Sequence, residues 1–99
     1  FLEITDEDWA RMMDINLKGA FICSQEVFQV MQKQGKGIIV NMASSGGQIG
    51  GPLAIHYSAS KAGVICLTKS LARIGAPYGI RINCIAPGLI DTEMTKSEI

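Results

Sequence analysis

The chain has 99 residues, a formal net charge of +0, 18% charged residues and 47% hydrophobic residues. These values fit one globular domain or part of one, and without a basic excess they give no electrostatic reason to expect a nucleic-acid partner. A long uncharged run from Gly37 to Tyr57 is interrupted by Asn, Gln, Ser, Gly, Pro and His, so neither a membrane-spanning helix nor a membrane partner is expected.

The number and spacing of the cysteines indicate whether the protein works in a reducing or an oxidising compartment. Cys23, Cys66 and Cys84 are odd in number, far apart, and each sits in an apolar pattern. That spacing suggests neither a disulfide framework nor a metal site, so reduced thiols buried in a core and a cytoplasmic location are expected. The chain begins at Phe1 without a leader pattern, and we interpret it as a piece of a longer protein.

The first predicted element is a long helix over about residues 5–34. Thr5 can cap it, and the three acidic residues that follow favour the positive end of the helix dipole. Apolar residues at three- and four-residue steps predict a buried stripe made of Trp9, Met13, Ala20, Cys23, Val27 and Met31, widened by Leu17, Phe21 and Phe28.

The rest of the chain predicts an α/β unit. Residues 38–42 form a β-branched run typical of a strand buried on both faces, and a glycine-rich loop follows it. A helix over about 55–78 and a strand over 81–85 come next. This order predicts two parallel strands joined by a right-handed crossover, with no domain boundary inside the chain.

Candidate site residues fall after both strands, where ligands bind in open α/β sheets. Ser44 follows the first strand, and a Pro87-Gly88 turn follows the second. Tyr57 and Lys61 are four residues apart and share a helix face, so the ammonium can favour the phenolate, although such a pair alone is a weak motif.

Two further polar residues need an interpretation. Asn16 lies inside the apolar stripe, where an amide without partners would cost about 1 to 3 kcal/mol, so it either serves a site or bonds a neighbouring loop for packing. His56 is next to Tyr57 on the helix and is expected to point elsewhere, without a catalytic role.

The glycine-rich stretch over residues 44–61, SSGGQIGGPLAIHYSASK, could suggest a phosphate-binding loop. Its glycines stand at positions 46, 47, 50 and 51, which fit neither GxGxxG nor a GK[ST] ending. A loop that connects Ser44 to the Tyr57 and Lys61 pair is therefore expected instead.

Four segments, in this order and spacing, resemble the short-chain dehydrogenase/reductase family of Rossmann-fold oxidoreductases over essentially the whole chain: DINLKGAF, GIIVNMASSGGQIG, YSASKAG and RINCIAPGLIDTEM. The resemblance implies part of a parallel, doubly wound sheet. It also implies that residues 1–99 are the second, catalytic half of an NAD(P)-binding domain whose cofactor-binding first half lies outside this sequence.

The resemblance also implies roles for individual residues. The catalytic tetrad would be Asn16, Ser44, Tyr57 and Lys61. Tyr57 would transfer a proton to or from the substrate oxygen, Ser44 would hydrogen-bond that oxygen, and Lys61 would favour the phenolate and hold the nicotinamide ribose. Asn16 would anchor a water that links Lys61 to solvent. The residues against the nicotinamide end of NAD or NADP would be Tyr57, Lys61, Pro87, Gly88, Ile90 and Thr92.

The implied activity is hydride transfer between NAD(P)(H) and a ketone or secondary alcohol. The amino-acid sequence of residues 76–94 most resembles that of 3-oxoacyl-[acyl-carrier-protein] reductases, so the small-molecule substrate could be bound to acyl carrier protein. Alternatives are a polyol, sugar or steroid dehydrogenase of the same family, or a catalytically silent module for nucleotide binding or assembly. A homodimer or homotetramer is expected of the whole protein, and no activity is expected of the isolated piece.

Overall fold

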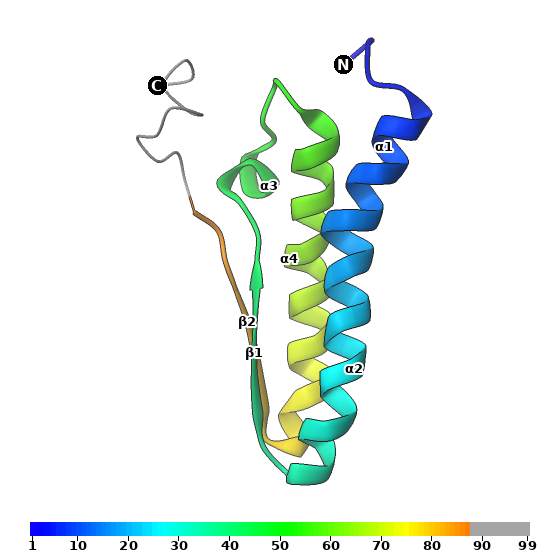
Figure 1. Cartoon of the computed structure of the whole chain (residues 1–99). Helices are drawn as coiled ribbons and strands as arrows, with labels where there is room; N and C mark the ends of the chain where they lie inside the picture. The colour runs from blue at the N-terminus through cyan, green and yellow to red at the C-terminus, as the bar shows by residue number, and fades with distance from the viewer. Residues whose placement is uncertain (88–99) are drawn as a thin grey trace.

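The structure is a computed structural model that describes residues 1–87. Two parallel strands form a small sheet, and two long helical segments lie side by side over one face of it (Figure 1). The elements in chain order are α1 (Asp6–Met13), the π-helical η1 (Asp14–Lys18), α2 (Gly19–Gln34), β1 (Gly37–Met42), α3 (Ser45–Ile49), α4 (Ile55–Gly75), the 3-10 helix η2 (Ala76–Tyr78) and β2 (Ile80–Ile85).

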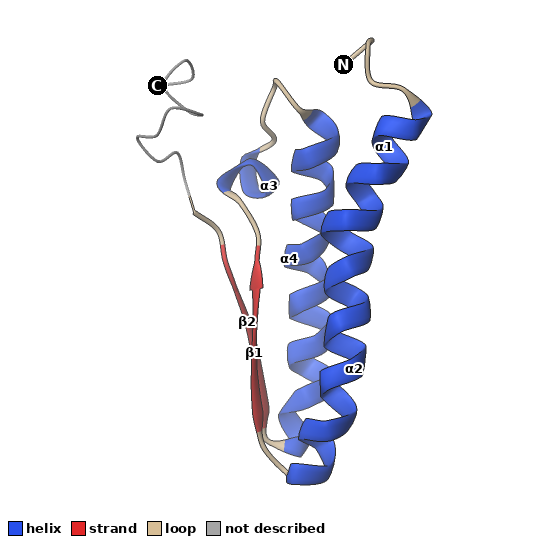
Figure 2. Ribbon diagram, in the orientation of Figure 1, coloured by secondary structure: helices blue, strands red, loops and turns tan. Residues whose placement is uncertain are grey.

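The first three elements form one continuous helix, as the sequence predicts (Figure 2). A reciprocal cap starts it, because the Asp8 backbone N–H donates to Thr5 Oγ1 at 3.0 Å and the Thr5 N–H donates to Asp8 Oδ2 at 3.1 Å. Gly35 ends it with a φ of 74°, in the left-handed region that favours glycine.

The predicted stripe on this helix is wrong in part. Trp9, Phe21, Cys23 and Val27 are exposed, whereas α2 buries Ser24. The buried side of the helix follows Met13, Leu17, Ala20, Ser24, Phe28 and Met31 instead. The helix also contains the π-helical turn η1, in which the Gly19 N–H reaches back five residues to the Asp14 carbonyl instead of four.

The β1-α4-β2 unit confirms the predicted α/β class and the parallel pairing. The register runs from Gly37 opposite Ile80 to Met42 opposite Ile85. α4 and α2 cover the sheet, and the core between the layers consists of Ile39, Ile80 and Ile82 with Phe28, Met31, Leu71 and Ala72 packed against it.

The prediction that β1 is buried on both faces is wrong for the chain described. Ile39 is 8% exposed, but its neighbours Ile38 and Val40 are 64% and 53% exposed. The helices of residues 1–87 lie on one side of the sheet only, so alternate side chains of each strand face away from them (Figure 2).

The expected burial of the cysteines is also wrong. All three are free, but Cys23 and Cys66 are exposed and Cys84 is half-buried. The two exposed thiols lie on parts of α2 and α4 that neither the sheet nor the neighbouring helix covers. None of the helices within residues 1–87 is long and apolar enough to cross a membrane.

Candidate active site

The carboxyl ends of the two strands bring Ser44 and Pro87 to one edge of the sheet. The parallel ladder continues past β1, because the Ala43 N–H donates to the Ile85 carbonyl at 2.7 Å. One residue after Ser44, the Ser45 N–H donates to the Pro87 carbonyl at 3.0 Å. The segments that follow the two strands are therefore fixed to each other by backbone hydrogen bonds.

Ser44 is the N-cap of α3, a short helix where the sequence predicts only a loop. Its Oγ accepts a hydrogen bond from the Gly46 N–H at 3.1 Å, which satisfies one of the free donors at the helix start. The serine before Ser45 was the available signal for this helix, but two glycines inside it argue against helix on propensity alone. Within residues 1–87, no hydrogen bond uses the Ser44 hydroxyl as donor.

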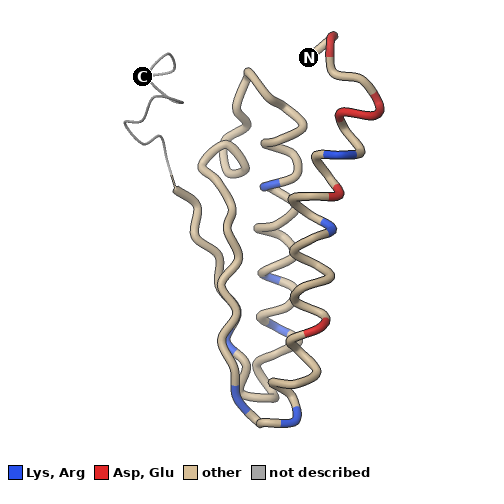
Figure 3. The backbone as a smooth tube through the Cα atoms, in the orientation of Figure 1, with Lys and Arg blue, Asp and Glu red and all other residues tan. Residues whose placement is uncertain are grey.

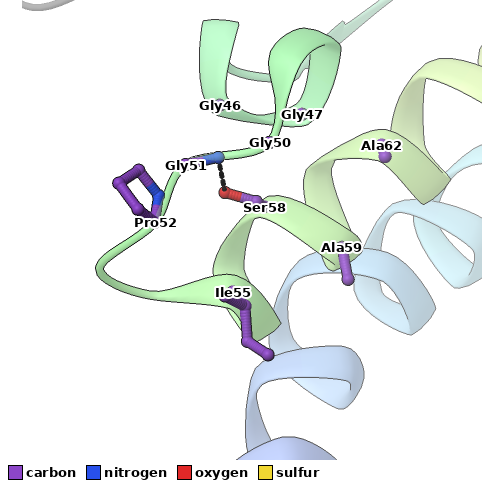
Figure 4. Close-up of a pocket in the computed structure, with 9 residues that line it drawn as sticks. All are labelled: Gly46, Gly47, Gly50, Gly51, Pro52, Ile55, Ser58, Ala59 and Ala62. Atoms are coloured by element: carbon purple, nitrogen blue, oxygen red, sulfur yellow. Dashed lines mark hydrogen bonds between the residues drawn. The ribbon is translucent and has the colours of Figure 1, made fainter. Parts of the chain in front are cut away.

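Gly47 sets the distance between α3 and α4. A Cβ built at this glycine would lie 2.7 Å from the Ala62 nitrogen and 2.7 Å from the Lys61 carbonyl carbon, which is closer than side chains tolerate. The other end of the loop is fixed by the Gly51 N–H, which donates to the buried Ser58 Oγ at 3.0 Å (Figure 4). Sequence reasoning missed both Gly47 and Ser58 as supports of the site.

Tyr57 and Lys61 lie on one face of α4, near its N-terminus. The Lys61 Nζ is 5.7 Å from the centroid of the Tyr57 ring and donates to the Met42 carbonyl, at the end of β1, at 3.0 Å. Lys61 is the only Lys, Arg, Asp or Glu between Lys36 and Lys69, so this part of the chain carries one isolated positive charge (Figure 3). Tyr57 is 37% exposed, and no hydrogen bond within the described part of the chain occupies its hydroxyl.

The Asn16 amide finds partners on two helices. Its Nδ2 donates to the Met12 Sδ and to the Ser60 Oγ, both at 3.1 Å. The packing partner considered from the sequence was a neighbouring loop, whereas the interhelical partner is Ser60, in the middle of the Tyr57 to Lys61 turn of α4. The water-anchoring role of Asn16 stays a prediction.

The other singled-out residues lie as follows. His56 borders a separate hollow with Asp8, Arg11 and Ile15, and neither Tyr57 nor Lys61 lines it. Its Nδ1 atom is buried without a partner among the described residues. Gly88, Ile90 and Thr92, the remaining residues predicted at the nicotinamide, lie outside the described residues.

A second hollow, of about 450 Å³, lies between the α3 loop and α4 (Figure 4). Its lining is glycine, alanine and a few larger groups: Gly46, Gly47, Gly50, Gly51, Pro52, Ile55, Ser58, Ala59 and Ala62. Tyr57 and Lys61 are not among these residues, so this hollow and the candidate acid-base pair occupy different sides of α4. Gly46, Gly47 and Gly51 are closely packed against neighbouring atoms, whereas a Cβ at Gly50 would meet open space.

A model of the short chain dehydrogenase family matches residues 1–99. The chain belongs to that family. The resemblance expected from the four sequence segments is thereby confirmed, and with it the Rossmann-type α/β class. Among solved structures, an NAD+-bound xylitol dehydrogenase is similar with a TM-score of 0.90 and 38% identity, over 95% of this chain and 36% of that one.

Curated relatives of this short-chain dehydrogenase carry the names of reductases. A 3-oxoacyl-[acyl-carrier-protein] reductase of Synechocystis is 45% identical, over 92% of this chain and 37% of its own length. An acetoacetyl-CoA reductase of the same organism is 45% identical, over 96% of this chain and 40% of its own length. The chain therefore spans about two fifths of the relatives that it matches.

The donors at the sheet edge fit one end of a nicotinamide dinucleotide. A lysine ammonium has three N–H donors, and one of those on Lys61 is bound to Met42, which leaves donors for the hydroxyls of a ribose. The hydroxyls of Tyr57 and Ser44 supply two more polar groups at this edge. This set is suited to moving a proton at an oxygen atom.

Proposed function

We propose that residues 1–99 are the catalytic part of a longer dinucleotide-binding domain, which reduces a ketone or oxidises a secondary alcohol with NAD(P)(H). The observation that carries the proposal is the pairing of Tyr57 with Lys61, whose Nζ lies 5.7 Å from the phenol ring, at the sheet edge that Ser44 also reaches. The family and the names of the relatives support it.

In the proposed mechanism, the residues of this chain manage the substrate oxygen. During reduction the Tyr57 hydroxyl donates its proton to that oxygen, and the Ser44 hydroxyl donates a second hydrogen bond to it. The Lys61 ammonium favours the phenolate left on Tyr57. NAD(P)H, when bound, would supply the hydride, with Lys61 and Tyr57 holding its ribose. Oxidation of an alcohol uses the same groups in the reverse direction.

Two further roles belong to the same proposal. Asn16 anchors a water through which Lys61 exchanges protons with solvent. Pro87, with Gly88, Ile90 and Thr92, contacts the nicotinamide, and the backbone bond between Ser45 and Pro87 supports a shared place for substrate and cofactor.

For the substrate we propose a 3-oxoacyl thioester, carried on acyl carrier protein or coenzyme A. The support comes from relatives at 45% identity whose names specify such substrates. A polyol is the second candidate, because the similar NAD+-bound structure is named a xylitol dehydrogenase.

The experiment is turnover of the whole protein, followed by the absorbance of the reduced cofactor. Acetoacetyl thioesters with NADPH or NADH should be consumed, while polyols with NAD+ or NADP+ should react at least about tenfold less efficiently, since a pocket built for one substrate rejects others by such factors. Faster polyol oxidation would move the assignment to the second candidate. No change of absorbance with any ketone or alcohol would favour a catalytically silent module.

Assembly is part of the same proposal. We propose a homodimer or homotetramer that forms through the outer face of α2, where Ile22 and Val30 are exposed. Sedimentation of the whole protein tests this, and a monomer would contradict it.

The three free cysteines support action in the reducing cytoplasm.

A further inference from the structure

Ser60 is a fully buried hydroxyl between the two residues of the acid-base pair. It is 0% exposed. Its Oγ donates to the Tyr57 carbonyl at 2.7 Å and accepts from the Asn16 Nδ2 at 3.1 Å. A serine hydroxyl has one proton to donate, so that proton is committed to the backbone of the residue that bears the phenol.

These two bonds join η1 to the first turns of α4. Asn16 belongs to the π-helical segment, and Ser60 carries its hydrogen bond on to the carbonyl of Tyr57. Two residues proposed for the site, far apart in sequence, are thus connected through a third residue that the site prediction did not include.

The start of α4 needs such a support. Its N-cap residue, Ala54, makes no side-chain cap, so the first turn has no capping bond of the usual kind. Tyr57 lies in that turn and has an exposed side chain. The hydrogen bond from the Ser60 Oγ to the Tyr57 carbonyl therefore restrains the backbone of a residue whose side chain is exposed.

We propose that Ser60 is a positioning residue, which transmits the position of Asn16 to Tyr57 and so holds the phenol in place beside Lys61. The inference rests on the proposed function. It gives the Asn16 side chain a task in addition to the water it is proposed to anchor, since the amide contacts Ser60 directly. Ser60 itself does not touch the reacting atoms.

The chain contains a matched control on the same helix. Thr68 is 4% exposed, its Oγ1 donates to the Val64 carbonyl at 2.7 Å, and it accepts from the Asn41 Nδ2 at 3.1 Å. It repeats the chemistry of Ser60 about 12 Å farther along the helix from Tyr57, at 1.5 Å per helical residue. A purely structural role predicts equal consequences for the two hydroxyls.

The first test measures turnover of the whole protein with Ser60→Ala and Thr68→Ala. Both variants should lower the midpoint of denaturation. Ser60→Ala should reduce kcat by about 10- to 100-fold, because small misplacements of reacting groups cost this much, with little change in the KM for the cofactor. Thr68→Ala should keep kcat within about threefold of the parent. Equal kcat values for the two variants would overturn the proposal.

A double-mutant cycle tests the connection to Asn16. If Asn16 acts on Tyr57 through Ser60, adding Ser60→Ala to Asn16→Ala should lower kcat by less than about twofold. Multiplicative losses would show that the two residues act independently and would contradict the proposal.

A second readout does not need turnover. In protein with isotope-labelled tyrosine, Asn16→Ala should shift the ring resonance of Tyr57 when Ser60 is present and leave it unchanged in a Ser60→Ala background, while Thr68→Ala should not move it. A wild-type protein without activity would reject the proposed function, and the resonance would still decide the role of Ser60. If the Tyr57 resonance does not shift in Asn16→Ala, whether Ser60 is present or replaced, that role is rejected.

Discussion

Gly47 shows how one residue controls the geometry of this site. A Cβ there would lie 2.7 Å from backbone atoms of Lys61 and Ala62, and the backbone of a helix cannot yield as a side-chain tip can. Gly47→Ala should therefore lower the free energy of unfolding by about 1 to 3 kcal/mol, the usual cost of overpacking. It should also displace α3, with Ser44 at its start, and lower turnover. Denaturant unfolding and kinetic assays of the whole protein measure the two effects.

Gly19 provides the control at this scale. A Cβ at Gly19 would meet only the Asp14 carbonyl, at 3.7 Å, and the backbone of Gly19 is already helical. Gly19→Ala should raise the free energy of unfolding by about 0.5 to 1 kcal/mol, because glycine loses more backbone entropy in a helix. Equal responses at positions 19 and 47 would show that α3 does not depend on close contact with α4.

At the scale of an element, the start of α1 depends on the reciprocal bonds of Thr5 and Asp8. These bonds hold the pKa of the Asp8 carboxyl below its ordinary value of 3.8, first through the Thr5 backbone N–H and then through the Thr5 side chain; slight desolvation opposes them, while the charges of Arg11 and His56 add to them. Because the pKa is lower in the folded state, the stabilisation is complete above the ordinary value and is lost as the pH falls through the folded value.

Thr5→Ala removes the side-chain contribution but keeps the backbone N–H, so it should raise the pKa of Asp8 only part of the way toward its ordinary value, whereas Thr5→Ser should keep it low. An NMR titration of the Asp8 carboxyl measures this directly. The same titration curve in Thr5→Ala and the parent would mean that the Thr5 side chain does not act on the carboxylate.

The elements that the sequence predicted correctly are those with a local cause. The cap at Thr5, the stop at Gly35 and the β-branched strand all follow from nearby residues. The buried face of the first helix followed only in part, because it depends on where the sheet and α4 pack, and it includes the polar Ser24 in place of Cys23 and Val27. Likewise α3 was missed, since Gly47 is chosen for its contact with α4 and its propensity points the other way.

The candidate site also has features that could be predicted from the sequence and one that could not. The spacing of Tyr57 and Lys61, and the place of Ser44 after a strand, could be predicted from helical and parallel-sheet geometry. The bond from Asn16 to Ser60 could not, because residues 44 positions apart meet only through the packing of η1 on α4.

At the scale of the whole molecule, one face of the sheet is left open by the elements of residues 1–87. Ile38, Val40, Met42 and Ile85 are all more than half exposed, and in this part of the chain each of the two strands pairs along one edge only. Residues 1–99 produced alone should therefore self-associate as concentration rises.

Sedimentation of residues 1–99 produced alone, with Val40→Thr or Val30→Thr, shows whether this self-association occurs through the sheet face or through α2. The two valines are similarly exposed, at 53% and 55%, but Val40 lies on the open sheet face and Val30 on α2. The Val40 change should reduce association more than the Val30 change. A larger decrease in association with Val30→Thr would place the self-association surface on α2.

The central claim is that Tyr57 moves the proton, and its direct test is the turnover of Tyr57→Phe beside Tyr78→Phe in the whole protein. Tyr78 lies in η2, beyond the C-terminal end of α4, where its ring packs edge-on against Phe28 at 6.2 Å. Removing the Tyr57 hydroxyl should lower kcat by about 10²- to 10⁴-fold and leave cofactor binding largely intact, whereas removing that of Tyr78 should leave kcat near the parent value. Turnover retained in Tyr57→Phe would contradict the account.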